Sequence, residues 1–531
     1  MSRKFPHKKS VVHAIAEKNT YQYPFYTFAE FESRSNKMAN AFTHLGITKG
    51  TRTLVFVTPR LDFSVITFAL FKIGAIPVLI DPGMGVKNLL NSVKQVRPEA
   101  IVSIGRVHWI RRLLPRYFSE LKIKVSLDPV GGKTHNLYST LDSESSEFTA
   151  VDMVDDDPSI ILFTSGGTGI PKGVLYTHGI LNAQTKALQE MFSLDENQID
   201  LPGFPLFALF TLAMGMTSVI PDMDPTSPAT CDPSKIVRNI IEQQVTFVAG
   251  SPAIWDRVGK YCIKKNIQLG SVKQVVMFGA PVRAEIHQMF QKILPFGDTY
   301  TPYGATECLP VTLISGSEVL GLHLDRMLQG GGTCIGKAVP NTLIKIIKTS
   351  DIPEQEIFEL RTEQIGEILV SGQQVTPQYF EMDEETKKAK IIQDGKIWHR
   401  MGDIGYLDKS QNLWFLGRKV HRVELAHQTF YPLQMEAPFN RHPLVKRTAL
   451  VSLNFEGKKS SGLVIERHDG QTQMSAKFRA EILRLGLTTE ATQTIQHFFL
   501  HPKFPVDVRH NIKIDRLKLS AWASRKVSQN V

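Results

Sequence analysis

Short apolar runs rich in β-branched residues alternate with segments of helical periodicity through the first 300 residues. Between the runs, apolar side chains recur at helical spacing, as they do over 63–73. Strands that alternate with helices are typical of parallel sheets covered by helices. The pattern therefore predicts an α/β fold of layered, mostly parallel sheets. The runs that predict buried strands are 53–57, 76–80, 159–164, 245–250 and 274–279.

The last part of the chain has a different rhythm. Two apolar runs, 447–453 and 461–466, flank a short polar turn and predict a hairpin. A helical segment and one more strand follow, so this part reads as a small α+β unit. The rhythm changes near LGRKVHR, which predicts an N-terminal domain over 1–417 and a C-terminal domain over 418–531.

Charge is distributed unevenly between these two parts. The 531-residue chain has a net charge of +11, and 418–531 carries 19 Lys and Arg against 9 Asp and Glu. A basic unit of this kind can meet a polyphosphate, a membrane surface or nucleic acid. No nucleic-acid-binding motif accompanies the charge, which disfavours nucleic acid. Hydrophobic residues at 42% and charged residues at 21% exclude a disordered, collagen-like or coiled-coil chain.

One uncharged segment, 201–221, is long enough to cross a membrane. Two prolines and two glycines interrupt it, namely Pro202, Gly203, Pro205 and Gly215. We therefore expect a buried helix or a pocket wall here. The four cysteines form no CxxC pair, and the first residues lack the apolar stretch of a signal peptide. These features favour a reducing, cytoplasmic setting.

The strongest local signal is the segment FTSGGTGIPKGVLYTHG, residues 163–179. Its glycines let backbone N–H groups approach an anion, its hydroxyl residues add donors, and Lys172 adds a point charge. It is not a Walker A loop, since Pro171 and Gly173 stand where that motif requires Gly and Ser or Thr. The composition and order of the segment predict a loop that holds a triphosphate.

This segment resembles the phosphate loop of the AMP-forming adenylating superfamily, which includes acyl-CoA synthetases, peptide-synthetase adenylation domains and luciferases. Three more motifs follow in the family's order over nearly the whole chain. YGATE (303–307) resembles YGxTE, Gly-Asp at 402–403 and Gly-Arg at 417–418 resemble the GD…GR pair, and NIKIDR (511–516) resembles SGKIxR. The resemblance implies a large adenylating domain with a small mobile lid domain behind it.

The resemblance implies a role for each matching residue. Tyr303, next to Gly304, should stack on adenine, and Asp403 should accept hydrogen bonds from the ribose; a turn Asp is the alternative. Arg418 should contact the ribose or the hinge, unless it is a surface Arg. The residues expected at the β- and γ-phosphates are Thr164, Ser165, Gly166, Gly167, Thr168, Gly169 and Lys172. The residues expected on the adenine side are Gly279, Ala280 and Pro281.

Three residues are expected to act on the reacting groups, again by resemblance. Thr306 should contact phosphate and Glu307 should hold Mg²⁺. Lys513 should bridge the acyl carboxylate and the α-phosphate, where a fixed cation stabilises charge that builds during attack; the alternative is a solvated tail Lys. ATP and Mg²⁺ are the cofactors that these roles imply.

The departures from the family pattern bear on the substrate. Ala208 stands where amino-acid-activating domains tend to carry an amine-binding Asp, which favours an apolar acyl chain. We expect Phe204, Phe207, Ala208 and Leu209 to line its pocket. Val420 replaces the usual hinge Asp or Lys, and the following loop, which borders the CoA tunnel in relatives, is rewritten. We expect no carrier-protein domain in the chain, which would make it a stand-alone activator.

A narrower resemblance fits these departures. Five segments are similar to β-lactone synthetases of bacterial long-chain olefin biosynthesis, which adenylate a β-hydroxy fatty acid and let its hydroxyl close a lactone without CoA. The alternatives are a fatty acyl-CoA or acyl-carrier ligase and, more remotely, a non-catalytic acyl or nucleotide binder. A serine hydrolase is disfavoured because the chain has no GxSxG elbow. The similar segments are 204–225, 417–422, 429–432, 442–451 and 506–514.

Two further features have open interpretations. His178 and His421 are candidate bases for the hydroxyl step, with a hydrogen-bonded structural role as the alternative. RVHWIRRLLPRYF (106–118) mixes arginines with aromatic residues. It predicts a solvated helix face, or else a contact with a membrane or a pathway enzyme that delivers acyl chains.

Overall fold

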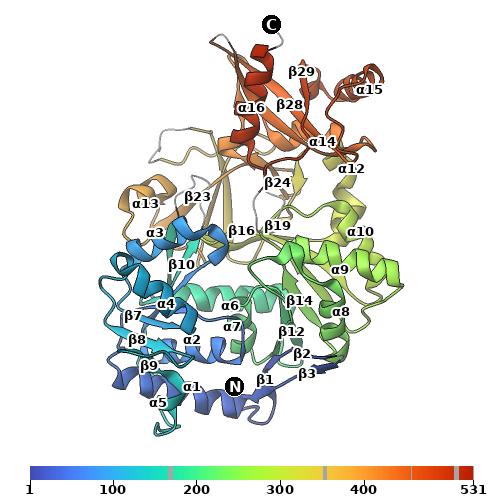
Figure 1. Ribbon diagram of the computed structural model, residues 1–531. Coiled ribbons are helices and arrows are strands. Elements are labelled where there is room, and N and C mark those ends of the chain that lie inside the picture. The colour runs from blue at the N-terminus through green and yellow to red at the C-terminus, as the bar shows by residue number, and fades with distance from the viewer. Residues whose placement is uncertain (19, 165–170, 351–355, 456, 507–513, 530–531) are drawn as a thin grey trace.

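The computed structural model describes residues 1–18, 20–164, 171–350, 356–455, 457–506 and 514–529, and Figure 1 shows their arrangement. Two large sheets form the body, a third sheet lies above them, and the C-terminal part stands at the top of the view.

The first large sheet has nine strands, and its central strands run parallel. Both edges are antiparallel: β4 pairs with β1, and β17 pairs with β16. In sheet order the strands are β19 (Lys337–Ala338), β17 (Cys308–Ser315), β16 (Asp298–Ala305), β15 (Gln274–Met277), β14 (Phe247–Gly250), β12 (Ile199–Pro202), β13 (Thr217–Ile220), β1 (Lys9–His13) and β4 (Phe25–Thr27).

The second large sheet has seven strands and is parallel except for the β10–β11 hairpin at one edge. That hairpin flanks the predicted phosphate loop. In sheet order the strands are β11 (Lys172–Thr177), β10 (Pro158–Thr164), β6 (Ile76–Ile80), β5 (Arg52–Phe56), β7 (Ala100–Ser103), β8 (Ile123–Ser126) and β9 (His135–Asn136).

Helices cover both faces of each large sheet, as parallel sheets require, because their strands are apolar on both sides. Seen in Figure 1, one group lies outside the seven-stranded sheet, one between the sheets and one outside the nine-stranded sheet. The outer groups are α3 (Val86–Val96) and α4 (Gly105–Leu113), and α8 (Pro233–Glu242), α9 (Pro252–Lys265) and α10 (Ala284–Ile293). The group between the sheets is α1 (Phe28–His44), α2 (Leu61–Ile73), α5 (Leu137–Leu141), α6 (His178–Phe192) and α7 (Phe207–Ala213).

A third sheet of six strands is antiparallel, and the sequence pattern did not anticipate it. Its strands are β18 (Thr333–Cys334), β24 (Leu413–Arg418), β23 (Lys396–Leu407), β21 (Gly366–Gly372), β20 (Thr342–Ile347) and β22 (Lys390–Gln393). The short helices that lead into it are α11 (Gly316–Glu318), α12 (Leu324–Leu328) and α13 (Asp383–Ala389). Two small hairpins lie elsewhere, β2 (Ile15–Glu17) with β3 (Thr20–Gln22) and β25 (Val423–Glu424) with β26 (Thr429–Phe430).

The C-terminal part builds cores of its own around a three-stranded sheet. The expected hairpin is present as β27 and β28, and the expected last strand pairs with it in parallel. Its elements are β27 (Val445–Phe455), β28 (Lys458–Arg467), β29 (His497–Leu500), α14 (Pro432–Asn440), α15 (Ala476–Gly486) and α16 (Arg516–Gln529).

The expected fold class is confirmed: helices and mostly parallel sheets form layers, with a small α+β unit at the C-terminus. The uncharged segment 201–221 folds as the end of β12, the buried helix α7 and β13. The two strands belong to the nine-stranded sheet, and α7 lies between the two large sheets. None of the helices in the described part of the chain is both long enough and apolar enough to cross a membrane.

Candidate active site

A cavity of about 2750 Å³ runs from the space between the two large sheets to the C-terminal part. One end is lined by apolar side chains of α6 and α7, and the other by polar residues of β11, β16 and β23. The residues that follow the carboxyl ends of several parallel strands line this cavity, which is where α/β sheets bind ligands. A ligand in the cavity can therefore contact its apolar end and its polar end together. The geometry joins a polar compartment to an apolar one.

Asp403 forms the polar centre of the cavity. Its side chain is 3% exposed, and the Tyr303 hydroxyl donates to Oδ2 at 2.5 Å. Arg418 Nη1 lies 3.1 Å from Oδ1, so β23 and β24 bring the predicted pair together. Burial raises the pKa of Asp403, and the Arg418 charge opposes that shift. Asp403 is thus a built acceptor rather than a solvated turn residue.

Glu307 is held by contacts from a distant segment. Tyr379 donates its hydroxyl to Glu307 Oε1 at 2.8 Å, and the Thr376 hydroxyl donates to the Glu307 carbonyl at 3.0 Å. The turn before Glu307 is tight: a Cβ on Gly304 would meet the Cys308 carbonyl oxygen at 2.8 Å. Glycine at 304 therefore lets the β16–β17 turn close beside the cavity.

Lys172 enters the same group from β11. Its Nζ lies 2.7 Å from Glu385 Oε2 and 4.8 Å from the centre of the Tyr379 ring. The side chain is 14% exposed, so this cation is largely withdrawn from solvent at the edge of the cavity. The backbone of Thr164 pairs with Lys172, which puts the strand end expected at the phosphates beside the cation.

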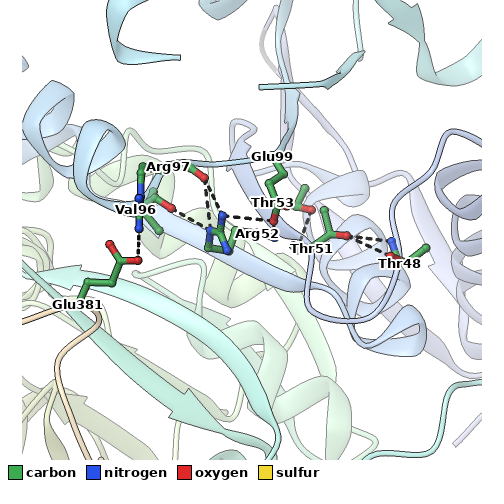
Figure 2. Close-up of polar contacts among 8 residues, drawn as sticks. All are labelled: Thr48, Thr51, Arg52, Thr53, Val96, Arg97, Glu99 and Glu381. Atoms are coloured by element: carbon green, nitrogen blue, oxygen red, sulfur yellow. Dashed lines mark hydrogen bonds and ion pairs between the residues drawn. The ribbon is translucent and has the colours of Figure 1, made fainter. Parts of the chain in front are cut away.

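The segment that carries Tyr379 is anchored to the seven-stranded sheet. Arg97, at the end of α3, forms an ion pair with Glu381, as Figure 2 shows. Gln95 donates to the Phe380 carbonyl at 3.1 Å, and Arg52 donates to the Arg97 carbonyl at 3.2 Å. These contacts fix the position from which Tyr379 reaches Glu307.

A buried lysine lies behind this group. Lys390, on β22, is 9% exposed, and its Nζ lies 3.4 Å from the Thr376 hydroxyl oxygen. Burial lowers the pKa of Lys390 to about 8, while the nearby Glu307 charge acts in the opposite direction. His399 pairs with it across the strands, and burial lowers the pKa of this histidine well below its ordinary value.

The apolar compartment is formed by α6, α7 and the strands beneath them. Phe207 stacks on Phe278 with ring centroids 4.4 Å apart, and Leu209 and Phe204 line the cavity as expected. Ala208 departs from the expectation. It faces the opposite side of α7 and packs in the core shared with α1 and α2. The remaining apolar lining residues of α6 and α7 are Leu181, Leu188, Phe192, Phe210 and Met214.

A buried acid supports the wall of this apolar compartment. Asp200, on β12, is fully buried, and the Thr211 hydroxyl of α7 donates to its Oδ2 at 2.8 Å. Burial raises the pKa of Asp200 to about 7. Thr211 lines the cavity, so this bond fixes the turn of α7 that faces the substrate side.

The other expected residues fall along the cavity. Gly279 (φ +87°), Ala280, Pro281 and Thr306 line it. His178 and His421 line it as well, and burial lowers the pKa of both, that of His421 to about 4. The ring of His178 also packs edge-on against the ring of Phe71, with the ring centres 6.1 Å apart.

Some expected residues lie outside the described part of the chain. They are Ser165, Gly166, Gly167, Thr168, Gly169 and Lys513, and the side chain of Thr164 is likewise not described. The neighbours of Lys513 are described: Ile514 and Arg516 line the same cavity as Asp403. Arg516 Nη2 donates to Glu436 Oε2 at 3.0 Å, which fastens the start of α16 to α14.

Residues 2–380 match the family described as AMP-binding enzyme. The chain belongs to the AMP-binding enzyme family. The resemblance drawn from the four motifs is thereby confirmed, and the catalytic class is that of an AMP-forming ligase.

Two relatives in this family are similar over nearly their full length. An olefin beta-lactone synthetase of Xanthomonas campestris is 39% identical over 515 residues, which covers 94% of this chain and 91% of the relative. The protein of the same name in Stenotrophomonas maltophilia is 38% identical, covering 94% and 92%. A 4-coumarate–CoA ligase of Arabidopsis thaliana is 25% identical, covering 81% of this chain and 75% of the relative.

Two solved structures share the fold of this chain. ATP-bound MatB from Rhodopseudomonas palustris has a TM-score of 0.78 at 19% identity, covering 98% of this chain and 96% of that one. O-succinylbenzoate coenzyme A synthetase from Bacillus subtilis, with ATP and magnesium ion, has a TM-score of 0.75 at 19% identity, covering 98% of each chain.

Four residues of the site were missed by sequence reasoning: Tyr379, Glu385, Lys390 and Thr376. Tyr379 lies 72 residues from Glu307, and no motif or spacing links the two. The one sequence feature that comes shortly before these residues is the apolar run GEILVSG (366–372), which folds as β21. Charge alone does not separate Lys390 from the neighbouring exposed lysines of α13.

Proposed function

We propose that this AMP-binding enzyme uses ATP to activate a long-chain β-hydroxy fatty acid as its acyl-adenylate and closes it to a β-lactone without CoA. One observation carries the proposal: a single cavity joins the Asp403 polar centre to the apolar wall of α7. The extended likeness to two olefin beta-lactone synthetases supports the choice of product.

The polar compartment suits the nucleotide. We assign Asp403 to the ribose hydroxyls, because a buried carboxylate with an arginine beside it is a strong, oriented acceptor. Tyr303 is assigned to the adenine, with Gly279–Pro281 along its edge. Lys172 and the loop before it are assigned to the β- and γ-phosphates, which the Lys172 charge attracts once a ligand competes with Glu385.

Glu307 fits a magnesium ion that is shared with the phosphates. Mg²⁺ is usually held by one or two carboxylates and by substrate oxygens, and Glu307 lies at the cavity with Tyr379 on one of its oxygens. No group of three or more His, Cys, Asp or Glu that could hold a metal occurs in the described residues, which agrees with a site completed by substrate. The ion would neutralise phosphate charge.

In the first step a carboxylate oxygen of the acid attacks the α-phosphorus, and the bond to pyrophosphate breaks. We assign Lys513 to the oxygens on which negative charge builds, with Thr306 on the phosphate. We assign residues 418–531 to a mobile lid that brings Lys513 to this point. The cavity lining by Ile514 and Arg516 supports that assignment.

In the second step the β-hydroxyl oxygen attacks the acyl carbonyl carbon, the bond to AMP breaks, and the hydroxyl proton leaves. Both reacting groups belong to one molecule, so their high effective concentration removes the need for a second substrate. The apolar wall excludes water that would hydrolyse the adenylate. His178 and His421 remain candidates for the proton acceptor, since burial lowers the pKa of both and so favours the neutral form. The four cysteines are buried and free, which supports a cytoplasmic setting.

Product identity tests the proposal. The enzyme is incubated with ATP, Mg²⁺ and a long-chain β-hydroxy acid, with and without CoA, and the products are identified by NMR and mass spectrometry. We expect a β-lactone and AMP in both incubations. A matched acid without the hydroxyl should give only adenylate. A thioester that forms only with CoA, with no lactone, would instead identify a fatty acyl-CoA ligase.

A further inference from the structure

Helix α4 exposes the side chains that a helix normally buries. Trp109, Ile110 and Leu113 are 60%, 44% and 80% exposed. Leu113 lies three residues after Ile110 and four after Trp109, so the three form one stripe of the helix. The buried face of α4 instead carries His108, whose Nε2 lies 3.0 Å from the Val125 carbonyl oxygen. An apolar stripe that faces solvent on a helix of nine residues marks an interaction surface.

Arginines surround this stripe. The guanidinium of Arg112 lies 4.8 Å from the centre of the Trp109 ring, and that of Arg116 lies 4.9 Å from the Tyr117 ring. Arg106 is exposed one turn before Ile110. Among the described residues, none of these three arginines forms an ion pair with a carboxylate. The set Arg106, Trp109, Ile110, Arg112, Leu113 and Arg116 is called the α4 surface below.

The α4 surface adjoins the rim of the substrate cavity. Val107, on the same helix, lines the cavity, and so does Ile104 directly before it. Pro82 and Gly83 line the cavity and are exposed, so the cavity reaches the surface at the start of α3. Helices α3 and α4 cover the same face of the seven-stranded sheet, on the left in Figure 1.

We infer that the α4 surface docks onto an anionic lipid bilayer. Tryptophan and leucine enter the boundary between head groups and acyl chains, while arginines meet lipid phosphates. Arg112 donates to the Gly131 carbonyl oxygen and Arg116 to the Tyr117 hydroxyl, and both partners are neutral, so the positive charges stay available to an anion. An apolar stripe ringed by positive charge matches an anionic lipid surface, because acyl chains take up the apolar side chains and the phosphates lie at the level of the guanidinium groups. Docking would set the cavity rim at the source of an acyl substrate; that consequence rests on the proposed function, whereas docking itself does not.

Vesicle sedimentation tests the inference with the full-length protein. Vesicles of phosphatidylcholine alone are compared with vesicles made of phosphatidylcholine and phosphatidylglycerol in equal amounts. We expect binding to the anionic vesicles that weakens with salt, and about 30-fold weaker binding for Arg106→Gln/Arg112→Gln. The matched control, Arg479→Gln/Arg484→Gln on α15, removes two exposed arginines elsewhere and should bind like the wild type.

A second measurement reports which surface enters the lipid. Of the five tryptophans, Trp255, Trp398 and Trp414 are buried and Trp522 is half-buried, so Trp109 is the one most open to quenching by brominated acyl chains. We expect strong quenching in the wild type and little in Trp109→Phe, which keeps an apolar ring and stays bound.

The outcomes separate this inference from the proposed function. Vesicle binding needs no catalysis, and pyrophosphate exchange with a dissolved acid in vesicle-free buffer should be unchanged in these variants, which also shows that they are folded. Equal binding by the Arg106→Gln/Arg112→Gln variant, or no quenching of Trp109, would overturn the inference. The inference would also be overturned if the wild-type protein did not bind anionic vesicles, as it would not if α4 served to bind a pathway enzyme.

Discussion

The polar and apolar ends of the cavity are built in opposite ways. At the polar end the two carboxylates have definite partners: Tyr303 and Arg418 on Asp403, and Tyr379 on Glu307. At the apolar end the walls are contacts among aromatic and aliphatic groups, such as Phe207 on Phe278. Hydrogen bonds and ion pairs are directional, whereas apolar packing is not.

The difference has a consequence for substitution. A polar group left without its partner in a buried site costs its full desolvation free energy, so the polar end tolerates few residue types. The apolar end accepts other hydrophobic residues of similar volume at small cost. We therefore expect changes at the polar end to lower the reaction rate for every substrate, and changes at the apolar end to alter which acyl chain is accepted.

The largest expected effect is at Lys513. Lys513→Ala should lower the rate of acyl-adenylate formation by about 10²–10³-fold, because a cation that acts mainly on the transition state is lost. ATP binding should remain. Pyrophosphate exchange measures the rate, and Lys503→Ala, an exposed lysine of the same basic stretch, is the matched control. Near-normal pyrophosphate exchange in Lys513→Ala would instead favour the alternative that Lys513 is a solvated lysine of the tail.

Asp403→Asn should have the next largest effect. The amide keeps the shape and can still accept from Tyr303, but it loses the charge that pairs with Arg418 and orients the ribose. A hydrogen bond to a charged group contributes about 1.5–3 kcal/mol, so the KM for ATP should rise about 10- to 100-fold. Steady-state kinetics at varied ATP measures this. An unchanged KM would remove the ribose assignment.

Asp200→Asn tests the apolar end, because it removes the titrating group that lies under the apolar wall. Burial raises the pKa of Asp200 to about 7, so the folded protein keeps a proton that the unfolded chain releases above about pH 4. The free energy of unfolding must then fall as pH rises from about 4 to about 7. Between about pH 5 and pH 8 the wild type should lose about 2 kcal/mol more than Asp200→Asn.

Urea unfolding at the two pH values measures that difference. Glu120→Gln, which neutralises an exposed carboxylate, should keep the wild-type dependence on pH. If Asp200→Asn and the wild type change in parallel, Asp200 is charged in the folded protein, and its bond with Thr211 is a charged one.

The smallest effect is expected from Leu209→Phe. Leu209 lines the apolar compartment, and a phenyl ring there should shorten the acyl chain that fits. Activity with the longest chains should fall about tenfold, with shorter chains little affected and the KM for ATP unchanged. A series of acids of increasing length measures this. A uniform loss for all chain lengths would mean that the apolar and polar ends are not separable.

The layered α/β architecture could be predicted from the sequence alone, and the motifs predicted which residues gather at the polar end of the cavity. The runs at 76–80 and 159–164 could be read as strands because parallel strands are apolar on both faces, and β6 and β10 are those strands. The resemblance to the GD…GR pair singles out Asp403 and Arg418 from the sequence alone, whereas the ion pair between them is seen only in the structure.

Only the tertiary structure decided the rest. Tyr379 reaches Glu307 across 72 residues, and Ala208 turns toward the core of α1 and α2 while Leu209 faces the cavity. A helix that is apolar all round carries no periodic signal of which side is lined by cavity and which by core. The buried state of Lys390 and the exposed stripe of α4 are likewise set by which elements pack against them. Burial arises from contacts between distant segments, and local residue patterns do not encode those contacts.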